Sequence, residues 1–219
     1  MDIKKNQSIA FVGESGSGKT TLVNLLTALL PFEHGEFLLN GRDIREYNIE
    51  DYKSKIGYIS QEPTIFSADI YDNVTFWAER SPMNIQKFRK VIAMCKLEQF
   101  VANLDEKENA LLGNNGLNIS GGQKQRISIA RELFRDVDIL IMDEATSALD
   151  SDTENEIRES LEILQGSLTI ISIAHRLSTV KNADCIYLMD KGRIVAQGDF
   201  DELKNNSIYF KRLAELQGL

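Results

Sequence analysis

Several residue types are scarce in this 219-residue chain, which has two cysteines, two histidines, three prolines and one tryptophan. Cys95 and Cys185 match no zinc-binding spacing and form no CxxC pair, so they favour two reduced thiols in a cytosolic setting over a disulfide scaffold. No apolar run approaches the roughly 18 residues that a membrane-spanning helix needs. The sequence also has no Gly/Ser-rich linker and no internal repeat. We therefore expect a soluble globular chain.

Positive charge is in short supply as well. The chain has 25 Lys and Arg against 33 Asp and Glu, which gives a net charge of −8. Proteins that bind a nucleic-acid backbone need clusters of Lys and Arg, so we expect no nucleic-acid partner. A small local groove around a nucleotide is still compatible with this balance.

Short apolar runs alternate with segments of helical spacing. The runs at residues 9–12, 56–59, 139–142 and 168–174 are predicted to be strands buried on both faces, as in parallel sheets. Helices are predicted over residues 19–30 and 123–134, and capping boxes predict helix starts at Ser151 and Asp199. Residues 37–40 are predicted to form an edge strand followed by a turn. Residues 83–104 have helical spacing without an adjacent strand, which predicts a helical insert in an α/β domain.

Each of the four predicted buried strands is followed by a residue that can bind or react. Gly13 and Asp143 come directly after their strands, Gln61 follows Ser60, and His175 follows Ala174. In open parallel sheets, ligands bind at the carboxyl ends of the strands. We therefore expect these four residues to share one site.

The stretch GESGSGKT, residues 13–20, fits the pattern G-x-x-x-x-G-K-[ST] between a predicted strand and a predicted helix. Gly13, Gly16 and Gly18 allow a tight turn in which backbone N–H groups converge on phosphate oxygens. Lys19 supplies a charge for the β- and γ-phosphates, and the Thr20 hydroxyl is a ligand for Mg²⁺. A plain glycine turn is the alternative, but the context favours a nucleoside triphosphate site.

The stretch DILIMDE, residues 138–144, is a predicted buried strand that ends in two carboxylates. Beside a phosphate-binding loop, Asp143 suits the Mg²⁺ shell and Glu144 suits the orientation or deprotonation of an attacking water. A lone histidine is usually structural, but the position of His175 indicates contact with the γ-phosphate or with Glu144. Gln61 is either a polar strand end or a site residue, and the spacing does not decide between them.

The stretch SGGQ, residues 120–123, has two interpretations. Ser120 is a good N-cap, and the stretch could simply begin a helix. Free N–H groups at a helix start also attract anions, so it could be a second phosphate-binding site.

These motifs together closely resemble those of the ATP-binding-cassette (ABC) ATPases, over nearly the whole chain. GESGSGKT resembles the Walker A loop, Gln61 in SQEPTIF the Q-loop, SGGQKQR the signature motif and ILIMDE the Walker B strand. SALD at residues 147–150 resembles the D-loop, and His175 in AHRLST the switch histidine. IFSADIYDNVTF and DEATSALD resemble exporters of the multidrug, lipid and peptide type.

The resemblance implies a set of roles for named residues. ATP would be bound by Gly13, Glu14, Ser15, Gly16, Ser17, Gly18, Lys19, Thr20 and Thr21 of one copy, and by Ser120, Gly121, Gly122 and Gln123 of another. Mg²⁺ would be held by Thr20, Gln61 and Asp143, and catalysis would involve Glu144, His175, Lys19 and Gln61. The implied fold is a mostly parallel sheet with an antiparallel edge region and a helical subdomain over about residues 62–120 of a single domain, residues 1–219.

The resemblance also implies partners. Two such domains would dimerise head to tail around two ATP molecules, and a transmembrane domain is expected to be fused upstream. The chain would then work at the cytoplasmic face of the cell membrane, where ATP hydrolysis would power export. The insert at residues 83–104 and the region around Gln61 would face the transmembrane domain.

The sequence departs from the family pattern in places. Exporters of this type usually carry an adenine-stacking aromatic residue upstream of the lysine motif, but only twelve residues precede Gly13. We therefore expect an N-terminally truncated domain that binds ATP weakly. Ile119 replaces the usual Leu of the signature, and Asn114 and Asn115 replace a Glu-Arg pair.

Two other functions compete with export. One is a non-transport ABC-type ATPase of DNA repair or of the ribosome, but the sequence has no sustained heptads and only one cassette. The other is a nucleotide sensor without turnover, which the presence of both Glu144 and His175 disfavours.

Overall fold

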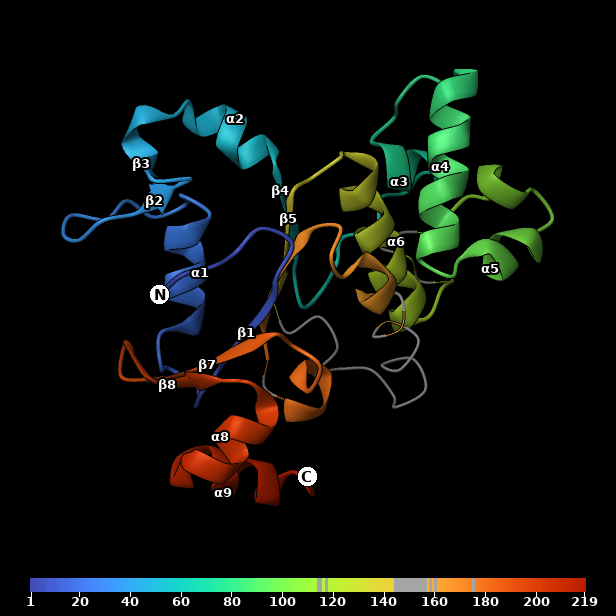
Figure 1. The fold of residues 1–219 in the computed structure, drawn as a ribbon. Helices are drawn as coiled ribbons and strands as arrows, with labels where there is room; N and C mark the ends of the chain where they lie inside the picture. The colour runs from blue at the N-terminus through green and yellow to red at the C-terminus, as the bar shows by residue number, and fades with distance from the viewer. Residues whose placement is uncertain (114–115, 117, 144–156, 158, 160, 175) are drawn as a thin grey trace.

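The computed structural model describes residues 1–219 except residues 114–115, 117, 144–156, 158, 160 and 175. Its described strands form one six-stranded sheet in the order β4-β5-β6-β1-β7-β8 and one two-stranded sheet, β2-β3 (Figure 1). The strands are β1 (Ser8–Val12), β2 (Leu38–Leu39), β3 (Arg42–Asp43), β4 (Ile56–Ile59), β5 (Ile139–Asp143), β6 (Thr169–Ile173), β7 (Cys185–Asp190) and β8 (Arg193–Gly198).

Helices cover both faces of the larger sheet. The α-helices are α1 (Lys19–Leu26), α2 (Ile49–Ser54), α3 (Ile70–Thr75), α4 (Pro82–Met94), α5 (Glu98–Ala102), α6 (Gly121–Phe134), α8 (Phe200–Asn206) and α9 (Ile208–Leu216). Short 3₁₀ helices are η1 (Ile44–Glu46), η2 (Lys107–Asn109) and η4 (Leu177–Val180). Figure 1 shows α1, α2 and the β2-β3 sheet on one side, and α6 with α3, α4 and α5 on the other.

Strand β1 lies at the centre of the fold because it pairs in parallel with both β6 and β7. Its side chains alternate between two hydrophobic clusters, as the pleat of a strand requires. Ile9 and Phe11 pack in the cluster that contains Val23 of α1. Ala10 and Val12 pack with Phe200 and other residues of the C-terminal helices. All five residues of β1 are therefore buried, which explains its continuous apolar sequence.

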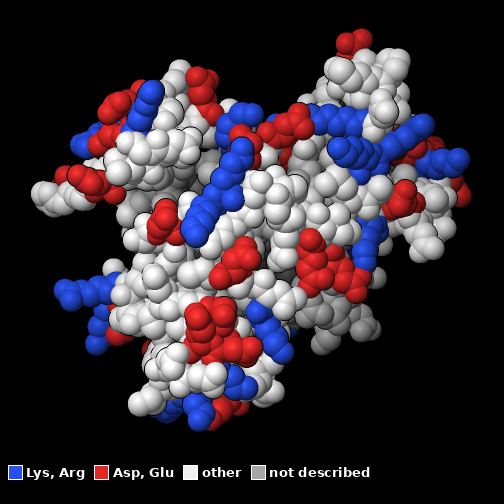
Figure 2. All heavy atoms as spheres, viewed as in Figure 1, with Lys and Arg blue, Asp and Glu red and all other residues white. Residues whose placement is uncertain are grey.

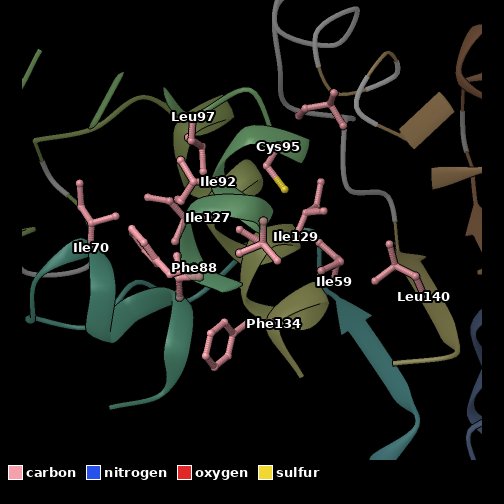
Figure 3. Close-up of a cluster of buried hydrophobic side chains, with 14 of the residues drawn as sticks. Ile59, Ile70, Phe88, Ile92, Cys95, Leu97, Ile127, Ile129, Phe134 and Leu140 are labelled. Atoms are coloured by element: carbon pink, nitrogen blue, oxygen red, sulfur yellow. The ribbon is translucent and has the colours of Figure 1, made fainter. Parts of the chain in front are cut away.

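Helix α6 joins the sheet to the helices that follow β4. Figure 3 shows its Ile127 and Ile129 among buried side chains from these helices and from β4 and β5. Gly57 of β4 allows this close packing, because a Cβ atom there would lie 2.9 Å from Cβ of Glu132. The C-terminal half of α6 and strand β4 are thus packed closely together.

The structure confirms the α/β fold with a mostly parallel sheet and an antiparallel edge. Strands β4, β5, β6, β1 and β7 pair in parallel, and β8 pairs antiparallel with β7. The four strands predicted to be buried on both faces are present within one residue at each end, as β1, β4, β5 and β6. Phe37 to Asn40 was expected to be an edge strand and turn, and β2 occupies its centre.

Three expectations for individual elements were wrong or incomplete. The first helix ends at Leu26 and not at residue 30, because Ala28 adopts a left-handed backbone with φ of 54°. Residues 83–104 form two helices, α4 and α5, with Lys96 at a left-handed φ of 52° between them. Strand β7 was not predicted, although the run CIYLM is apolar and a turn at Lys191 and Gly192 follows it.

Three α-helices, α3, α4 and α5, and the 3₁₀ helix η2 lie between β4 and α6 in the part of the chain that the structure describes. They agree with a helical insert, although the division of the chain into a core and a subdomain at residues 62–120 remains a prediction. The helix predicted to start at Ser151 begins outside the described residues. Within the described ranges, no helix is both long and apolar enough to cross a membrane.

Candidate functional site

The carboxyl ends of β4, β5, β6 and β1 meet at one edge of the sheet because these four strands run parallel. The register places Asp143 of β5 beside Ile173 of β6, and Ile173 beside Phe11 of β1. The loop at Gly13 starts two residues after Phe11, and Gln61 lies two residues after the end of β4. The structure thus brings the loop, Asp143 and Gln61 to one edge, as expected.

The loop at residues 13–18 wraps around the Lys19 side chain. The Lys19 ammonium donates hydrogen bonds to the carbonyl oxygens of Gly13 at 2.8 Å and Glu14 at 3.0 Å, and the residue is only 5% exposed. Gly18 caps α1 with a left-handed φ of 99°, a conformation that glycine adopts without strain. The positive charge is therefore held within the loop, at the N-terminus of a helix.

The β7-β8 hairpin supports this loop from the side. A Cβ atom on Gly13, where φ is 155°, would lie 2.2 Å from the carbonyl oxygen of Met189, so only glycine fits. The N–H of Gly192, in the hairpin turn, donates to the Ser17 carbonyl at 2.9 Å. The unpredicted strand β7 is therefore part of the framework of the site.

Tyr58 is a residue of the site that the sequence motifs did not reveal. Its hydroxyl donates a 2.6 Å hydrogen bond to Oδ2 of Asp143. Burial, and after it the hydrogen bond to Asp143, raises the pKa of Tyr58 well above its usual value. The only signal in the sequence was a tyrosine three residues before Gln61, in a strand otherwise made of Ile and Gly.

The signature stretch forms the start of α6, as its capping residues predicted. The Ser120 hydroxyl accepts a hydrogen bond from the Gln123 N–H at 3.2 Å, and the Gln123 side chain accepts one from the Ser120 N–H at 2.8 Å. Ser120 and Gly121 are exposed, whereas Gly122 is buried. An exposed, well-capped helix start is thus presented at the surface, where it can meet an anion from outside the chain.

Arg131, on the same helix, hydrogen-bonds the segment that follows Gln61 and so links it to α6. Its guanidinium donates to the carbonyls of Asn73 at 2.7 Å and Thr64 at 2.9 Å, and it is only 5% exposed. It also lies 4.9 Å from the centre of the Phe66 ring. The Gln61 side chain itself is exposed. Helix α6 is therefore connected mechanically to the loop that carries Gln61.

The C-terminal helix α9 reaches two parts of the site. Tyr209 hydrogen-bonds Glu14, and burial together with this bond raises the pKa of Tyr209. The side chain of Gln217, just after α9, accepts a 2.7 Å hydrogen bond from the Leu177 N–H at the start of η4. Tyr209 and Glu14, 195 residues apart along the chain, are thus held together at this edge.

The donors at this edge suit Mg²⁺. Thr20 offers a hydroxyl, Asp143 a carboxylate and Gln61 an amide oxygen, which are the hard ligands that this ion prefers. Among the described residues there is no cluster of three His, Cys, Asp or Glu side chains. Mg²⁺ does not require one, because one or two carboxylates with phosphate oxygens and waters complete its shell.

Some predicted site residues are not described. Glu144 and His175 lie outside the described residues, as does the stretch at residues 147–150. Glu14, Ser15, Gly16, Thr20 and Thr21 are exposed, and Ser17 and Lys19 are buried in the loop. The individual roles of all these residues remain predictions.

Charges of both signs cover the surface shown in Figure 2. Basic side chains on this face are interspersed with acidic ones, and acidic side chains form groups near its centre. Among the described residues visible there, no continuous basic surface runs across the face. This arrangement is unlike the basic stripe typical of proteins that bind nucleic-acid backbones.

Comparison with protein families gives a match over most of the chain. The model of the family described as ABC transporter matches residues 1–147. A solved structure of a bacterial Atm1-family ABC exporter with ATP bound superposes on the chain with a TM-score of 0.87 at 31% identity. It covers 100% of this chain, which in turn covers 38% of that exporter.

Relatives of known name are longer proteins. The ATP-dependent lipid A-core flippase of Francisella tularensis subsp. tularensis (strain FSC 198) is 43% identical over 213 residues, which are 97% of this chain and 35% of the flippase. The ATP-binding cassette sub-family B member 5 of Mus musculus is 39% identical over 215 residues, 98% of this chain and 17% of that protein. The chain thus spans about a third or less of these relatives.

Proposed function

This chain belongs to the ABC transporter family as an ATP-binding, ATP-hydrolysing domain, and from that premise we propose that it powers export by a membrane transporter. The observation that carries the proposal is the meeting of the Lys19 loop, Asp143 and Gln61 at one edge of the sheet. A phosphate-binding loop, an acidic strand end and a polar side chain are the groups that phosphoanhydride hydrolysis needs.

We assign the binding of the ATP phosphates to residues 13–21. The N–H groups at the start of α1 converge on the phosphates, and the Lys19 ammonium turns from the carbonyls of Gly13 and Glu14 toward them. The exchange is favourable because a phosphate oxygen is a charged acceptor and a carbonyl oxygen is neutral.

Mg²⁺ fits the same site, and when bound it neutralises charge on the transferred phosphate. Thr20, Asp143 and Gln61 are the residues that would hold it. Glu144 orients or deprotonates the attacking water, and His175 contacts the γ-phosphate or steadies Glu144. These two roles come from the resemblance of the motifs, because both residues lie outside the described ranges.

The exposed start of α6 supports a head-to-tail dimer. One domain with one phosphate loop needs no second anion site, whereas two facing domains complete each other's sites. Ser120, Gly121, Gly122 and Gln123 of one copy would then contact ATP bound by residues 13–21 of the other. Since ATP binds the closed dimer better than the open one, ATP drives closure and its hydrolysis reopens the dimer.

Export requires a membrane domain that this chain does not contain among its described helices. The relatives named a flippase and a bacterial exporter are each more than twice as long as their match to this chain. We propose that the chain works with a transmembrane domain, fused upstream, at the cytoplasmic face of the cell membrane. The insert at residues 83–104, which forms α4 and α5, and the loop at Gln61 would face that domain.

Glu144→Gln tests the enzymatic part of the proposal. It removes the basic carboxylate, so ATP turnover is expected to fall at least about 100-fold while ATP binding persists. The matched control is Asp138→Asn, which changes an exposed carboxylate at the opposite end of the same strand. Phosphate release measures turnover. Equal rates for wild type and Glu144→Gln would contradict the catalytic assignment, and the absence of turnover in both would favour a nucleotide sensor.

A further inference from the structure

We propose that Tyr58 is a positioning residue for the metal-binding carboxylate of Asp143, an inference that rests on the proposed function. The observation that carries it is the 2.6 Å hydrogen bond from the Tyr58 hydroxyl to Asp143 Oδ2. No motif in the sequence assigns Tyr58 a role.

The sheet register explains why these two side chains meet. Strands β4 and β5 are neighbours (Figure 1). Their register places Tyr58 opposite Ile141. Side chains two residues apart on a strand point to the same face, so Asp143 lies on the same face as Ile141 and Tyr58. The tyrosine is long enough to reach one step along the neighbouring strand, to the point where β5 ends.

Hydrophobic packing holds the Tyr58 ring in place, and its hydroxyl extends from the ring to the site. It is half-buried and packs against the hydrophobic cluster that contains Ile9, Ile56 and Ile141. A ring packed in this way has little freedom to rotate, so its hydroxyl occupies a fixed place. A fixed donor restricts the rotation of the carboxylate that accepts from it.

The bond is of the strong kind, because the acceptor is a carboxylate and the donor a partly buried hydroxyl. It engages Oδ2 and sets the plane of the carboxyl group, which orients the group for the cation that Asp143, Thr20 and Gln61 would hold. Groups that hydrogen-bond a metal ligand commonly change metal affinity 10- to 100-fold when they are removed. Tyr58 therefore tunes the affinity of the site for Mg²⁺ more than its affinity for ATP alone.

Tyr58→Phe tests this role because it deletes the hydroxyl and keeps the ring. The matched control is Tyr52→Phe, which deletes a 2.6 Å hydrogen bond to the Leu26 carbonyl, in the same hydrophobic cluster but directed at α1. Mn²⁺ serves as the probe, and its binding to the protein with ATP is measured by electron paramagnetic resonance. ATP binding without metal, in EDTA, is measured in parallel.

Tyr58→Phe is expected to raise the Kd for Mn²⁺ about 10-fold and to leave ATP binding in EDTA unchanged. Tyr52→Phe is expected to change neither quantity, although both variants lose a buried hydroxyl. In an Asp143→Asn background, Tyr58→Phe is expected to have no further effect on metal affinity, since it acts through that carboxylate.

Two results would overturn the inference alone, and a third would overturn it together with the proposed function. Equal Mn²⁺ affinities of wild type and Tyr58→Phe would contradict it alone, and so would a full 10-fold effect of Tyr58→Phe in the Asp143→Asn background. A wild-type chain that binds neither ATP nor Mn²⁺ with ATP would contradict the proposed function, and this inference with it.

Discussion

Gly57 shows how a single small residue determines the packing around the site. It is fully within β4, and its absent side chain makes room for Glu132 and Leu140. Burial raises the pKa of Glu132. The ion pair with Arg135 acts in the opposite direction and partly offsets this increase. Because Gly57 does not have a positive φ, its importance is steric and not conformational.

Gly57→Ala is expected to destabilise the chain by about 1–3 kcal/mol through overpacking. The added Cβ would lie 2.9 Å from Cβ of Glu132 and 3.1 Å from Cδ1 of Leu140. Urea unfolding measures the change in free energy. Gly113→Ala is the control, because its nearest neighbour would be at an ordinary 3.6 Å. If Gly57→Ala were no less stable than Gly113→Ala, α6 would have room to move away from β4.

Helix α6 connects the signature stretch at its N-terminus to the segment that follows Gln61. Its N-terminus carries the exposed signature stretch, and Arg131 near its C-terminus binds the segment after Gln61. Asn73 is fully buried and completes this junction, since its side chain hydrogen-bonds the N–H and the carbonyl of Phe66. A shift of α6 would therefore displace the loop that follows β4.

Arg131→Lys is expected to cost about 2–4 kcal/mol of stability, because an ammonium cannot reproduce the guanidinium bonds to Thr64 and Asn73. Arg89→Lys, a change on the exposed face of α4, is the control and should have little effect. Urea unfolding gives the stability. Hydrogen exchange at the Phe66 amide reports the junction itself, and unchanged protection there would contradict the proposed connection.

At the scale of the molecule, the surface start of α6 and the Lys19 loop belong to two copies in the proposed dimer. Ser120→Arg places a bulky charge at the helix start, so ATP-driven dimerisation and turnover are expected to be lost. ATP binding by the monomer should be nearly unchanged, because residues 13–21 are untouched. Light scattering with ATP, ATP binding and phosphate release measure the three quantities.

The substitution also removes a helix cap, which alone costs about 1 kcal/mol. Ser81→Arg removes the equivalent cap of α4, where the Ser81 hydroxyl accepts from the Asn84 N–H, and it controls for this loss. Ser81→Arg should still dimerise with ATP. Turnover that survives Ser120→Arg would show that the signature stretch does not complete a partner's site.

Local features of the chain could be read from its sequence with good accuracy. The strand at Ile56–Ile59 was predicted at its observed bounds, Ser120 is an N-cap as predicted, and Asp199 begins the predicted capping box. Glycine turns, caps and apolar runs depend on residues a few positions apart, so short stretches contain the information. The loop at residues 13–18 is of this kind, since Gly16 and Gly18 have the positive φ that its tight turn requires.

Contacts between distant residues could not be read in this way. Tyr58 and Asp143 are 85 positions apart, Arg131 and Thr64 are 67 apart, and β7 pairs with β1 across most of the chain. Such pairs depend on strand order and register, and a slip of one residue would turn Tyr58 to the opposite face. The sequence therefore predicted the loop at residues 13–20 and its chemistry, whereas the packing of the whole chain selected the residues that hold this loop in place.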